Sequence, residues 1–232
     1  MRTDLKINRG IVLRLAKYLR VLQKLKSLGF VKVFSNNLGD AVGVTPAVVR
    51  KDFSQINIPG NKRGGYNVDT LIEHIVDVLG KDDSQNIVVV GYGNIGRALL
   101  NYRDFQSEGI HVAACFDVKP DLLDRHSEPP ILPVEELKSF VRENQVKIAA
   151  LAVPDSAATE VFDLLIEAGV RGVLNFTSVE VKCAGKCDMY NCPIRCVVQN
   201  VNIGLEIENL FYLVNMKEAE GPDLDGCEDE SE

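Results

Sequence analysis

The segment NIVVVGYGNIGRALL, residues 86–100, restricts the fold more than any other part of the chain. It begins with an uninterrupted apolar run, Ile87–Val90, which is typical of a central strand in a parallel sheet that is buried on both faces. The spacing Gly91-x-Gly93-x-x-Gly96 follows directly, and a helical apolar pattern comes after it. In such a turn the three glycines permit a sharp reversal, a close approach of a pyrophosphate, and close packing of helix on strand. The segment therefore predicts a strand, a phosphate-binding turn and a helix whose N-terminus faces the phosphates.

A carboxylate follows at the distance expected in a dinucleotide-binding fold. The next apolar stretch, IHVAACFDV, contains Asp117, 21 residues after Gly96. A carboxylate in this position accepts hydrogen bonds from the adenosine ribose and repels a 2′-phosphate, so it favours NAD(H) over NADP(H) as the cofactor. A fold of the same type that binds CoA, or no nucleotide, is the alternative.

Helix and strand patterns continue to alternate after this point. VEELKSFVREN and SAATEVFDLLIEAG have helical spacing, whereas KIAALAVPD and RGVLNFTS are typical of strands. This alternation predicts an α/β fold with a doubly wound parallel sheet of the Rossmann type. Ligands of such sheets lie beyond the carboxyl ends of the strands. The predicted cofactor-binding residues are therefore Gly91, Tyr92, Gly93, Asn94, Ile95, Gly96, Asp117, Val118, Pro154, Asn175 and Phe176.

The first 80 residues differ from the rest of the chain in charge. They contain 13 Lys and Arg against 6 Asp and Glu, whereas the remainder contains 13 basic and 27 acidic residues. A basic segment on an acidic chain indicates a module that binds a polyanion, although lysine-rich helix faces in solvent would give the same balance.

Three helices are predicted within this basic segment. Asn8 caps the first, which carries apolar residues at helical spacing. The second begins in SNNLGDAVG with Ser35 or Asn36 as its cap, and the third has Thr45 as its cap and Pro46 at the first helical position. Two short helices joined by about three residues are typical of a helix-turn-helix, whose second helix enters the major groove of DNA.

The segment INIPGNKRGGYNV, residues 56–68, predicts a β-hairpin with a basic tip, as in the wing of a winged helix. Cations at such a tip reach narrow minor grooves. The helix that follows, residues 68–79, is predicted to connect the two halves of the chain, with His74 on its surface. A charged helical packing domain is the alternative. The predicted contacts to double-stranded DNA are Ser35, Thr45, Arg50, Lys51, Lys62 and Arg63.

The sequence lacks the groups expected of a dehydrogenase. Hydride transfer to a carbonyl usually needs a positioned acid or base. His74 lies in the predicted connecting helix, His111 begins a strand at the end away from the ligand edge, and His126 lies in a polar loop. The sequence therefore favours a protein that reports on its cofactor over an enzyme. An NAD-dependent oxidoreductase with a basic appendage, and a nucleotide- or CoA-binding subunit of a complex, are the alternatives.

Eight stretches together give a resemblance that covers nearly the whole chain. They are YLRVL, VTPAVVRKDFSQ, RGGYNV, GYGNIGRALLNY, FDVKP, LAVPDSAA, AGVRGVLNFTSV and QNVNIGLEIENL. In order and spacing the chain resembles the Rex family of redox-sensing transcriptional repressors. The resemblance implies a homodimer that binds palindromic operator DNA through a winged helix and releases it when NADH replaces NAD in a Rossmann domain.

The resemblance also implies a dimer-crossing helix and a set of coupling residues. The helix corresponds to GLEIENLFYLVNM, whose apolar residues need a covering surface, either a partner subunit or the chain's own domain. An Arg, a Tyr and an Asp form a charged contact set in the family. The first two correspond to Arg20 and Tyr102, whereas Asn202, which has no charge, stands at the position of the acid.

The segment KCAGKCDMYNCPIRC, residues 182–196, departs from the family pattern, which has a shorter loop here. Four thiolates within fifteen residues are enough for one tetrahedral zinc ion or one iron–sulfur cluster. The spacing C-x3-C-x4-C-x3-C matches no common zinc ribbon, so reversible disulfides and unligated thiols stay open as alternatives. The candidate metal ligands are Cys183, Cys187, Cys192 and Cys196.

These patterns divide the chain into four predicted parts. A winged-helix domain with its connecting helix spans residues 1–80, and a Rossmann domain spans 81–204. The dimerisation helix spans 205–217, and an acidic tail, 218–232, is predicted to be disordered because it has eight acids and no base. No apolar run reaches the roughly 18 residues that span a bilayer, and the N-terminus has no secretion signal. A cytoplasmic protein without a membrane partner is therefore expected.

Overall fold

The computed structural model of this chain describes residues 8–59, 64–80, 85–182 and 196–220. It divides into two compact units. The first unit comprises Met1–Gln85 together with Asp104–Gly109, and the second comprises Asn86–Arg103 and Ile110–Glu232. The short stretch Asp104–Gly109 therefore belongs to the first unit, although it lies in the middle of the segment for which the sequence predicts the Rossmann domain.

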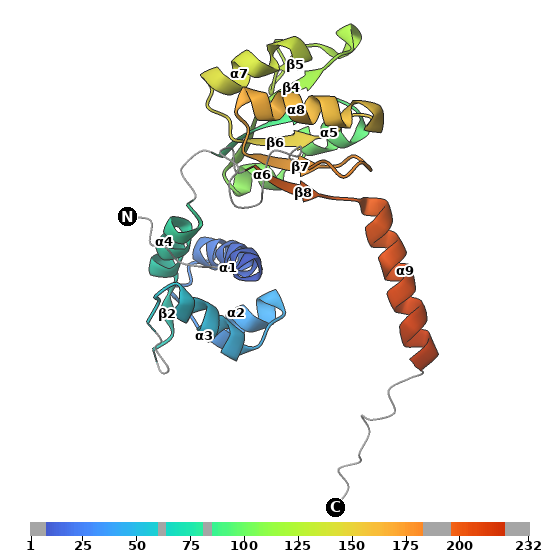
Figure 1. The fold of residues 1–232 in the computed structure, drawn as a ribbon. Helices are drawn as coiled ribbons and strands as arrows, with labels where there is room; N and C mark the ends of the chain where they lie inside the picture. The colour runs from blue at the N-terminus through green and yellow to red at the C-terminus, as the bar shows by residue number, and fades with distance from the viewer. Residues whose placement is uncertain (1–7, 60–63, 81–84, 183–195, 221–232) are drawn as a thin grey trace, which may run out of the picture. The chain divides into compact units, whose positions relative to one another are not determined.

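The first unit is built from helices with a small two-stranded sheet (Figure 1). Asn8 caps the first helix as predicted, because its Oδ1 accepts a hydrogen bond from the Ile11 amide at 3.0 Å. The predicted cap of the second helix is wrong: Phe34 precedes that helix, and Ser35 is already helical. The elements are α1 (Arg9–Ser27), β1 (Lys32–Val33), α2 (Ser35–Val42), α3 (Pro46–Gln55), β2 (Tyr66–Asn67) and α4 (Val68–Leu79).

Helix α4, which the sequence predicts to connect the two halves of the chain, also packs into the core of this unit. Its residues Val68, Leu71 and Ile75 are buried in the same apolar cluster as the inner face of α1. His74 is half-buried, and its Nε2 lies 2.7 Å from the carbonyl oxygen of Ile56, directly after α3. Helix α4 thus helps to hold the C-terminal end of α3.

The predicted hairpin differs in its strand pairing. Tyr66 and Asn67 of β2 pair in antiparallel register with Val33 and Lys32 of β1. Residues 56–59 form no strand in the described part of the chain, and the predicted basic tip, with Lys62 and Arg63, lies outside the described residues. The small sheet therefore ties the region after the predicted tip to the segment before α2.

A buried ion pair fixes α3 against α1. Asp52 of α3 is 1% exposed, and its carboxylate accepts hydrogen bonds from Arg14 Nε at 2.6 Å and Arg14 Nη2 at 2.7 Å. The Tyr18 hydroxyl donates to the same carboxylate at 3.1 Å. Burial, followed by the nearby Asp52 charge, raises the pKa of Tyr18. Phe53 also packs edge-on against Tyr18 with ring centroids 5.5 Å apart, so α3 has both a polar and an apolar anchor.

The second unit contains a six-stranded sheet with the order β5-β4-β3-β6-β7-β8 (Figure 1). The pairings β3–β6, β4–β5, β6–β7 and β7–β8 are parallel. The strands are β3 (Gln85–Val90), β4 (Ile110–Asp117), β5 (Ile131–Pro133), β6 (Ile148–Leu151), β7 (Gly172–Asn175) and β8 (Val197–Asn200). The chain moves outward from β3 to β5 and then returns to β6 on the other side of β3. Parallel sheets bind ligands at such a reversal of strand order.

Apolar side chains cover both faces of this sheet. Because side chains alternate along a strand, Val88 and Val90 lie on one face of β3 and Val89 on the other. The first face packs against α7 (Leu137–Glu143) and α8 (Ala158–Ala168), and the second packs against α5 (Asn94–Leu100). This arrangement confirms the predicted doubly wound fold.

The remaining helices are short or terminal. They are α6 (Asp104–Ser107), the 3₁₀ turns η1 (Pro120–Leu122), η2 (Val134–Glu136) and η3 (Asp155–Ala157), and α9 (Ile203–Glu220). Helix α9 includes the first three residues of the predicted disordered tail, and residues 221–232 lie outside the described residues. No helix among the described residues is long and apolar enough to cross a bilayer.

We predict that Asp52→Asn lowers the free energy of unfolding by about 2–3 kcal/mol, because it removes one partner of a buried ion pair whose other partner, Arg14, is partly exposed. Chemical denaturation followed by circular dichroism measures this change. Asp40→Asn is the matched control, since Asp40 is exposed on α2, and its effect should stay within about 0.5 kcal/mol. Equal effects of the two substitutions would contradict the anchoring role of Asp52.

Candidate functional site

The glycine-rich turn has the geometry that the sequence predicts. Gly91 has φ +100°, and a Cβ there would lie 2.3 Å from the carbonyl oxygen of Ala152. A Cβ on Gly96 would lie 1.9 Å from the carbonyl oxygen of Gly91. In contrast, a Cβ on Gly93 would meet no atom within 4 Å. Two glycines therefore permit close packing of the protein on itself, and Gly93 leaves open space beside the N-terminus of α5.

Asp117, at the end of β4, is held in place by backbone amides. Its Oδ2 accepts a hydrogen bond from Tyr92 N at 2.7 Å, and its Oδ1 accepts one from Lys119 N at 2.9 Å. Each carboxylate oxygen can accept a further hydrogen bond. Asp117 is half-buried, so its remaining acceptor positions face the open space beside the turn. The side chain is thus positioned to meet two neighbouring hydroxyl groups of a ribose.

A cavity of about 710 Å³ connects these features. It lies at the carboxyl ends of β3, β4 and β6, where the strand order reverses. Most of the predicted cofactor residues line it, including Gly93, Asp117 and Pro154. The full lining is Val90, Gly91, Tyr92, Gly93, Asn94, Ile95, Arg97, Phe116, Asp117, Val118, Lys119, Asp121, Leu122, Val134, Ala152, Val153, Pro154, Ala157 and Val161.

Three predicted cofactor residues do not line this cavity. Gly96 is buried under the turn, where it allows α5 to contact Gly91. Asn175 is fully buried, and its amide nitrogen donates to Val179 O at 2.7 Å and to Asn200 Oδ1 at 2.8 Å. Phe176 packs against the apolar cluster around Cys115. The amide of Asn175 therefore organises the backbone after β7, because its hydrogen-bonding groups are used within the protein.

Arg97 and Lys119 also line the cavity, and both are cationic. Neither is among the cofactor-binding residues predicted from the sequence. The Arg97 guanidinium carbon lies 4.9 Å from the centre of the Tyr92 ring, a cation–π contact that places the positive charge beside the turn. Arg97 lies in the middle of the helix after the turn, and Lys119 follows Asp117 by two residues. Their positions shortly after the ends of β3 and β4 could have identified them as lining residues in the sequence. Positive side chains at this place suit a pyrophosphate.

The candidate DNA-binding face lies on α2 and α3. Thr45 caps α3 as predicted, because its Oγ1 accepts from Val48 N at 3.4 Å. Arg50 and Lys51 are exposed, and Arg50 Nη1 donates to Ser35 Oγ at 3.2 Å. A concavity of about 960 Å³ lies beside them and is bordered by Phe34, Ser35, Asn36, Arg50, Ser54, Asn57, Ile58, Pro59, Gly65 and Tyr66. Arg50 is thus held against the start of α2.

The three predicted coupling residues differ in their contacts and in their exposure. Arg20 of α1 forms an ion pair with Glu108. Tyr102, after α5, is half exposed. Asn202 accepts a hydrogen bond from Leu205 N at 3.1 Å through its Oδ1, so the amide at the expected position of an acid caps the N-terminus of α9.

The cysteine-rich loop lies almost entirely outside the described residues, which include only Cys196 of its four cysteines. Cys183, Cys187 and Cys192 belong to the residues that the structure does not describe, so the metal-binding hypothesis stays a prediction. Cys115 is fully buried in β4, and burial raises the pKa of its thiol to about 12. It is therefore a neutral core residue.

Comparisons with known proteins match two separate parts of the chain. The model of a family described as putative DNA-binding protein N-terminus matches residues 6–54, and that of the CoA binding domain matches residues 82–179. The redox-sensing transcriptional repressor Rex of Desulforamulus reducens is 35% identical over 92% of this chain and 98% of its own length. Its counterpart in Ligilactobacillus salivarius is 36% identical over 91% and 96%.

Two solved structures of RSP, a Rex-family repressor, resemble this chain along most of its length. The complex of RSP with β-NAD⁺ and operator DNA has a TM-score of 0.79 at 26% identity, covering 92% of this chain and 94% of RSP. The complex with β-NADH has a TM-score of 0.73 at 27% identity, covering 92% and 97%.

We predict that Gly93→Ala weakens NADH binding at least about tenfold, because the added methyl group occupies the space that a pyrophosphate would enter. The thermal midpoint should change little, since this Cβ contacts no protein atom and the backbone φ of −78° is ordinary. Calorimetry and thermal denaturation measure the two effects. Gly172→Ala, in β7 and away from the cavity, is the control and should leave NADH binding unchanged.

Proposed function

Because the chain belongs to the Rex family of redox-sensing transcriptional repressors, we propose that it binds operator DNA through its first unit and releases that DNA when NADH occupies the cavity of its second unit. The proposal rests on the combination of three features in one chain. They are the open turn at Gly93, the hydrogen-bond acceptor at Asp117, and the exposed basic residues Arg50 and Lys51 on α3. The RSP complexes, one with NAD⁺ and operator DNA and one with NADH, support the direction of the switch.

The cavity favours NAD(H) over nucleotides that carry an additional phosphate on the adenosine ribose. Asp117 is fixed by two backbone amides, so it cannot readily turn away from a ligand. A phosphate on the 2′-oxygen, as in NADPH, or on the 3′-oxygen, as in CoA, would bring two anions together. This repulsion favours NAD(H) over CoA, although the matching family model is described as a CoA binding domain.

We also propose that the second unit reports on the cofactor and does not catalyse its turnover, because the relatives of this chain are named as redox-sensing repressors. Of the described residues that line the cavity, none is His, Ser or Cys. His111 is exposed at the start of β4, the end of the strand opposite the cavity.

Contacts to DNA come from α2, α3 and the predicted wing. Arg50, oriented by Ser35, would contact the sugar–phosphate backbone, because its guanidinium lies against the start of α2. Lys51 would lie next to it on the exposed side of α3. Lys62 and Arg63 are proposed to extend the contact into a minor groove.

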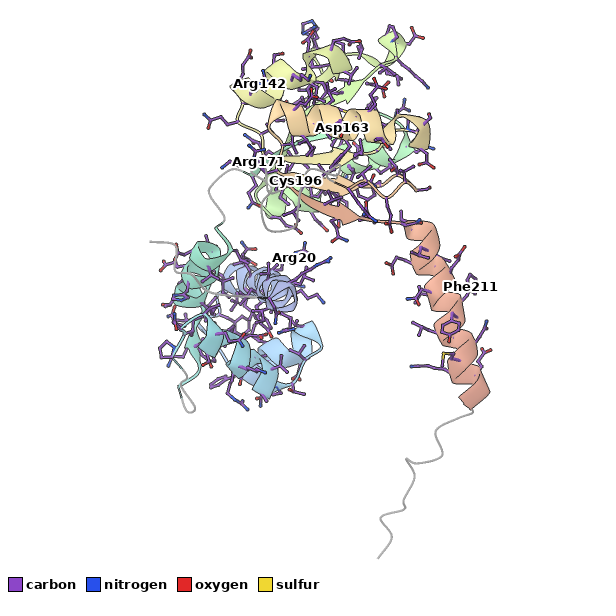
Figure 2. All side chains as sticks on the ribbon, viewed as in Figure 1. Arg20, Arg142, Asp163, Arg171, Cys196 and Phe211 are labelled. Atoms are coloured by element: carbon purple, nitrogen blue, oxygen red, sulfur yellow. The ribbon has the colours of Figure 1, made fainter. Side chains whose placement is uncertain are left out.

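The dimer is proposed to form around α9. Every described side chain from Ile203 to Glu218 is exposed, and Figure 2 shows Phe211 projecting from this helix. Burying apolar surface gains about 25 cal/mol per Å². The many exposed apolar side chains of α9 therefore favour association with another surface. A second copy of the chain is the occupant that a symmetric repressor on a palindromic site would use. The exposed apolar residues are Ile203, Leu205, Ile207, Leu210, Phe211, Tyr212, Leu213, Val214 and Met216.

The central test is a fluorescence-anisotropy titration of labelled operator DNA with the protein, using the operators of Rex relatives as probes. We expect NADH to weaken operator binding at least about tenfold, whereas NAD⁺, NADPH and CoA should not. Calorimetry with the same four nucleotides shows which of them bind. Arg50→Ala should weaken DNA binding without changing the NADH affinity. Operator binding that ignores saturating NADH would reject the proposed function.

We further predict that Leu210→Glu with Phe211→Glu converts the dimer into a monomer, because two charges would enter an apolar interface at a cost of several kcal/mol. Analytical ultracentrifugation measures the mass. The control is Glu208→Gln, on the same helix, which should leave the dimer intact. A dimer that persists in the double variant would place the interface elsewhere.

A further inference from the structure

The segment Asp104–Gly109 joins α5 to β4 along the chain, but it packs as part of the first unit. It forms the short helix α6 and ends at Gly109, whose φ of +72° is in the left-handed region. The carbonyl oxygen of Gly109 accepts a hydrogen bond from Gln85 N at 3.1 Å. A short insert from the nucleotide-binding half of the sequence is therefore anchored in the DNA-binding unit.

One side-chain attachment of this segment is an ion pair between Glu108 and Arg20 of α1. The Glu108 side chain is 15% exposed, whereas that of Arg20 is 63% exposed. The amide of Glu108 donates to the carbonyl oxygens of Asp104 at 3.0 Å and Phe105 at 3.1 Å, so the carboxylate extends from a formed helical turn. Figure 2 shows Arg20 projecting from α1. Glu108 is thus fixed by its helical turn, and the more exposed Arg20 side chain extends from α1 to contact it.

Helix α1 passes this attachment on to the DNA-binding helix. Arg14, six residues before Arg20 on α1, makes the bidentate ion pair with the buried Asp52 of α3. Leu15 and Leu19 lie in the same core as Phe53 of α3. Because these contacts are buried and close-packed, α1 and α3 move together. A force on Arg20 therefore changes the position of the helix that carries Arg50 and Lys51.

At its other end, the segment follows closely on the cofactor site. Only α5 and the residues Asn101–Arg103 separate the phosphate turn at Gly93 from Asp104. Binding of a pyrophosphate at the N-terminus of α5 acts directly on this helix. A small shift of α5 reaches the segment through three residues of backbone.

On the basis of the proposed function, we propose that Glu108 is the positioning residue through which cofactor binding controls DNA binding. Its ion pair with Arg20 attaches the segment Asp104–Gly109 to α1 within the first unit, and α1 carries the change to α3. Glu108 does not line the cavity and is not on the exposed face of α3, so its effect lies in the coupling between the two ligands and not in the affinity for either one.

The experiment compares operator affinity with and without saturating NADH, using full-length protein and anisotropy. The ratio of the two dissociation constants measures the coupling. Glu108→Gln keeps the shape of the side chain and removes its charge. We expect the ratio to fall about threefold to fivefold toward 1, the size expected for one partly exposed ion pair. The NADH affinity, measured by calorimetry, should change by less than about twofold.

Two further variants make the test specific. Glu167→Gln is the matched control, because Glu167 is also paired with a cation, Lys138, but lies on α8, and it should keep the wild-type ratio. The charge exchange Arg20→Glu with Glu108→Arg should restore most of the ratio lost in Glu108→Gln. A ratio in Glu108→Gln equal to or above that of the wild type, or no recovery in the exchange variant, would overturn this role of the ion pair. A wild-type protein without any NADH effect would instead overturn the proposed function itself and this inference with it.

Discussion

The close approach of α5 to the end of β3 is the constraint on which the rest of the second unit depends. A single Cβ on Gly96 would collide with the carbonyl oxygen of Gly91, and one on Gly91 would collide with Ala152 at the end of β6. Only with glycine at both positions do β3, β6 and α5 meet at one point. That point is where the strand order reverses, so the same packing creates the cavity and directs the N-terminus of α5 into it.

The first unit depends on a different kind of contact. Asp52 is buried on α3, and its charge is compatible with the core because Arg14 and Tyr18 supply three hydrogen bonds. These directional hydrogen bonds fix the position of α3 on α1 more closely than apolar packing alone, which permits the helices to slide. The ion pair of Arg20 with Glu108 lies on the same α1. Helix α1 therefore forms ion pairs both with α3 and with the segment after α5.

The fold was largely predictable because its signals are local. The apolar run before Gly91, the helical spacing of α1, α7 and α8, and the caps at Asn8 and Thr45 all depend on residues within one or two turns. The strand β5 (Ile131–Pro133) was not predicted, because three residues beside prolines carry too little periodicity. For α4, the amphipathic pattern predicts that one face is buried, but it does not predict which partner covers that face.

The sequence by itself determined the glycine-rich turn, Asp117 as the carboxylate beside it, and Thr45 as the cap of α3, because each follows from short spacing and intrinsic backbone preference. Only the tertiary structure decided that Asn175 uses its amide within the protein, that Arg97 and Lys119 join the cavity, and that residues 104–109 belong to the first unit. These outcomes depend on contacts between residues far apart in the chain. Such contacts arise only when separate elements pack together, and no local pattern of residues specifies them.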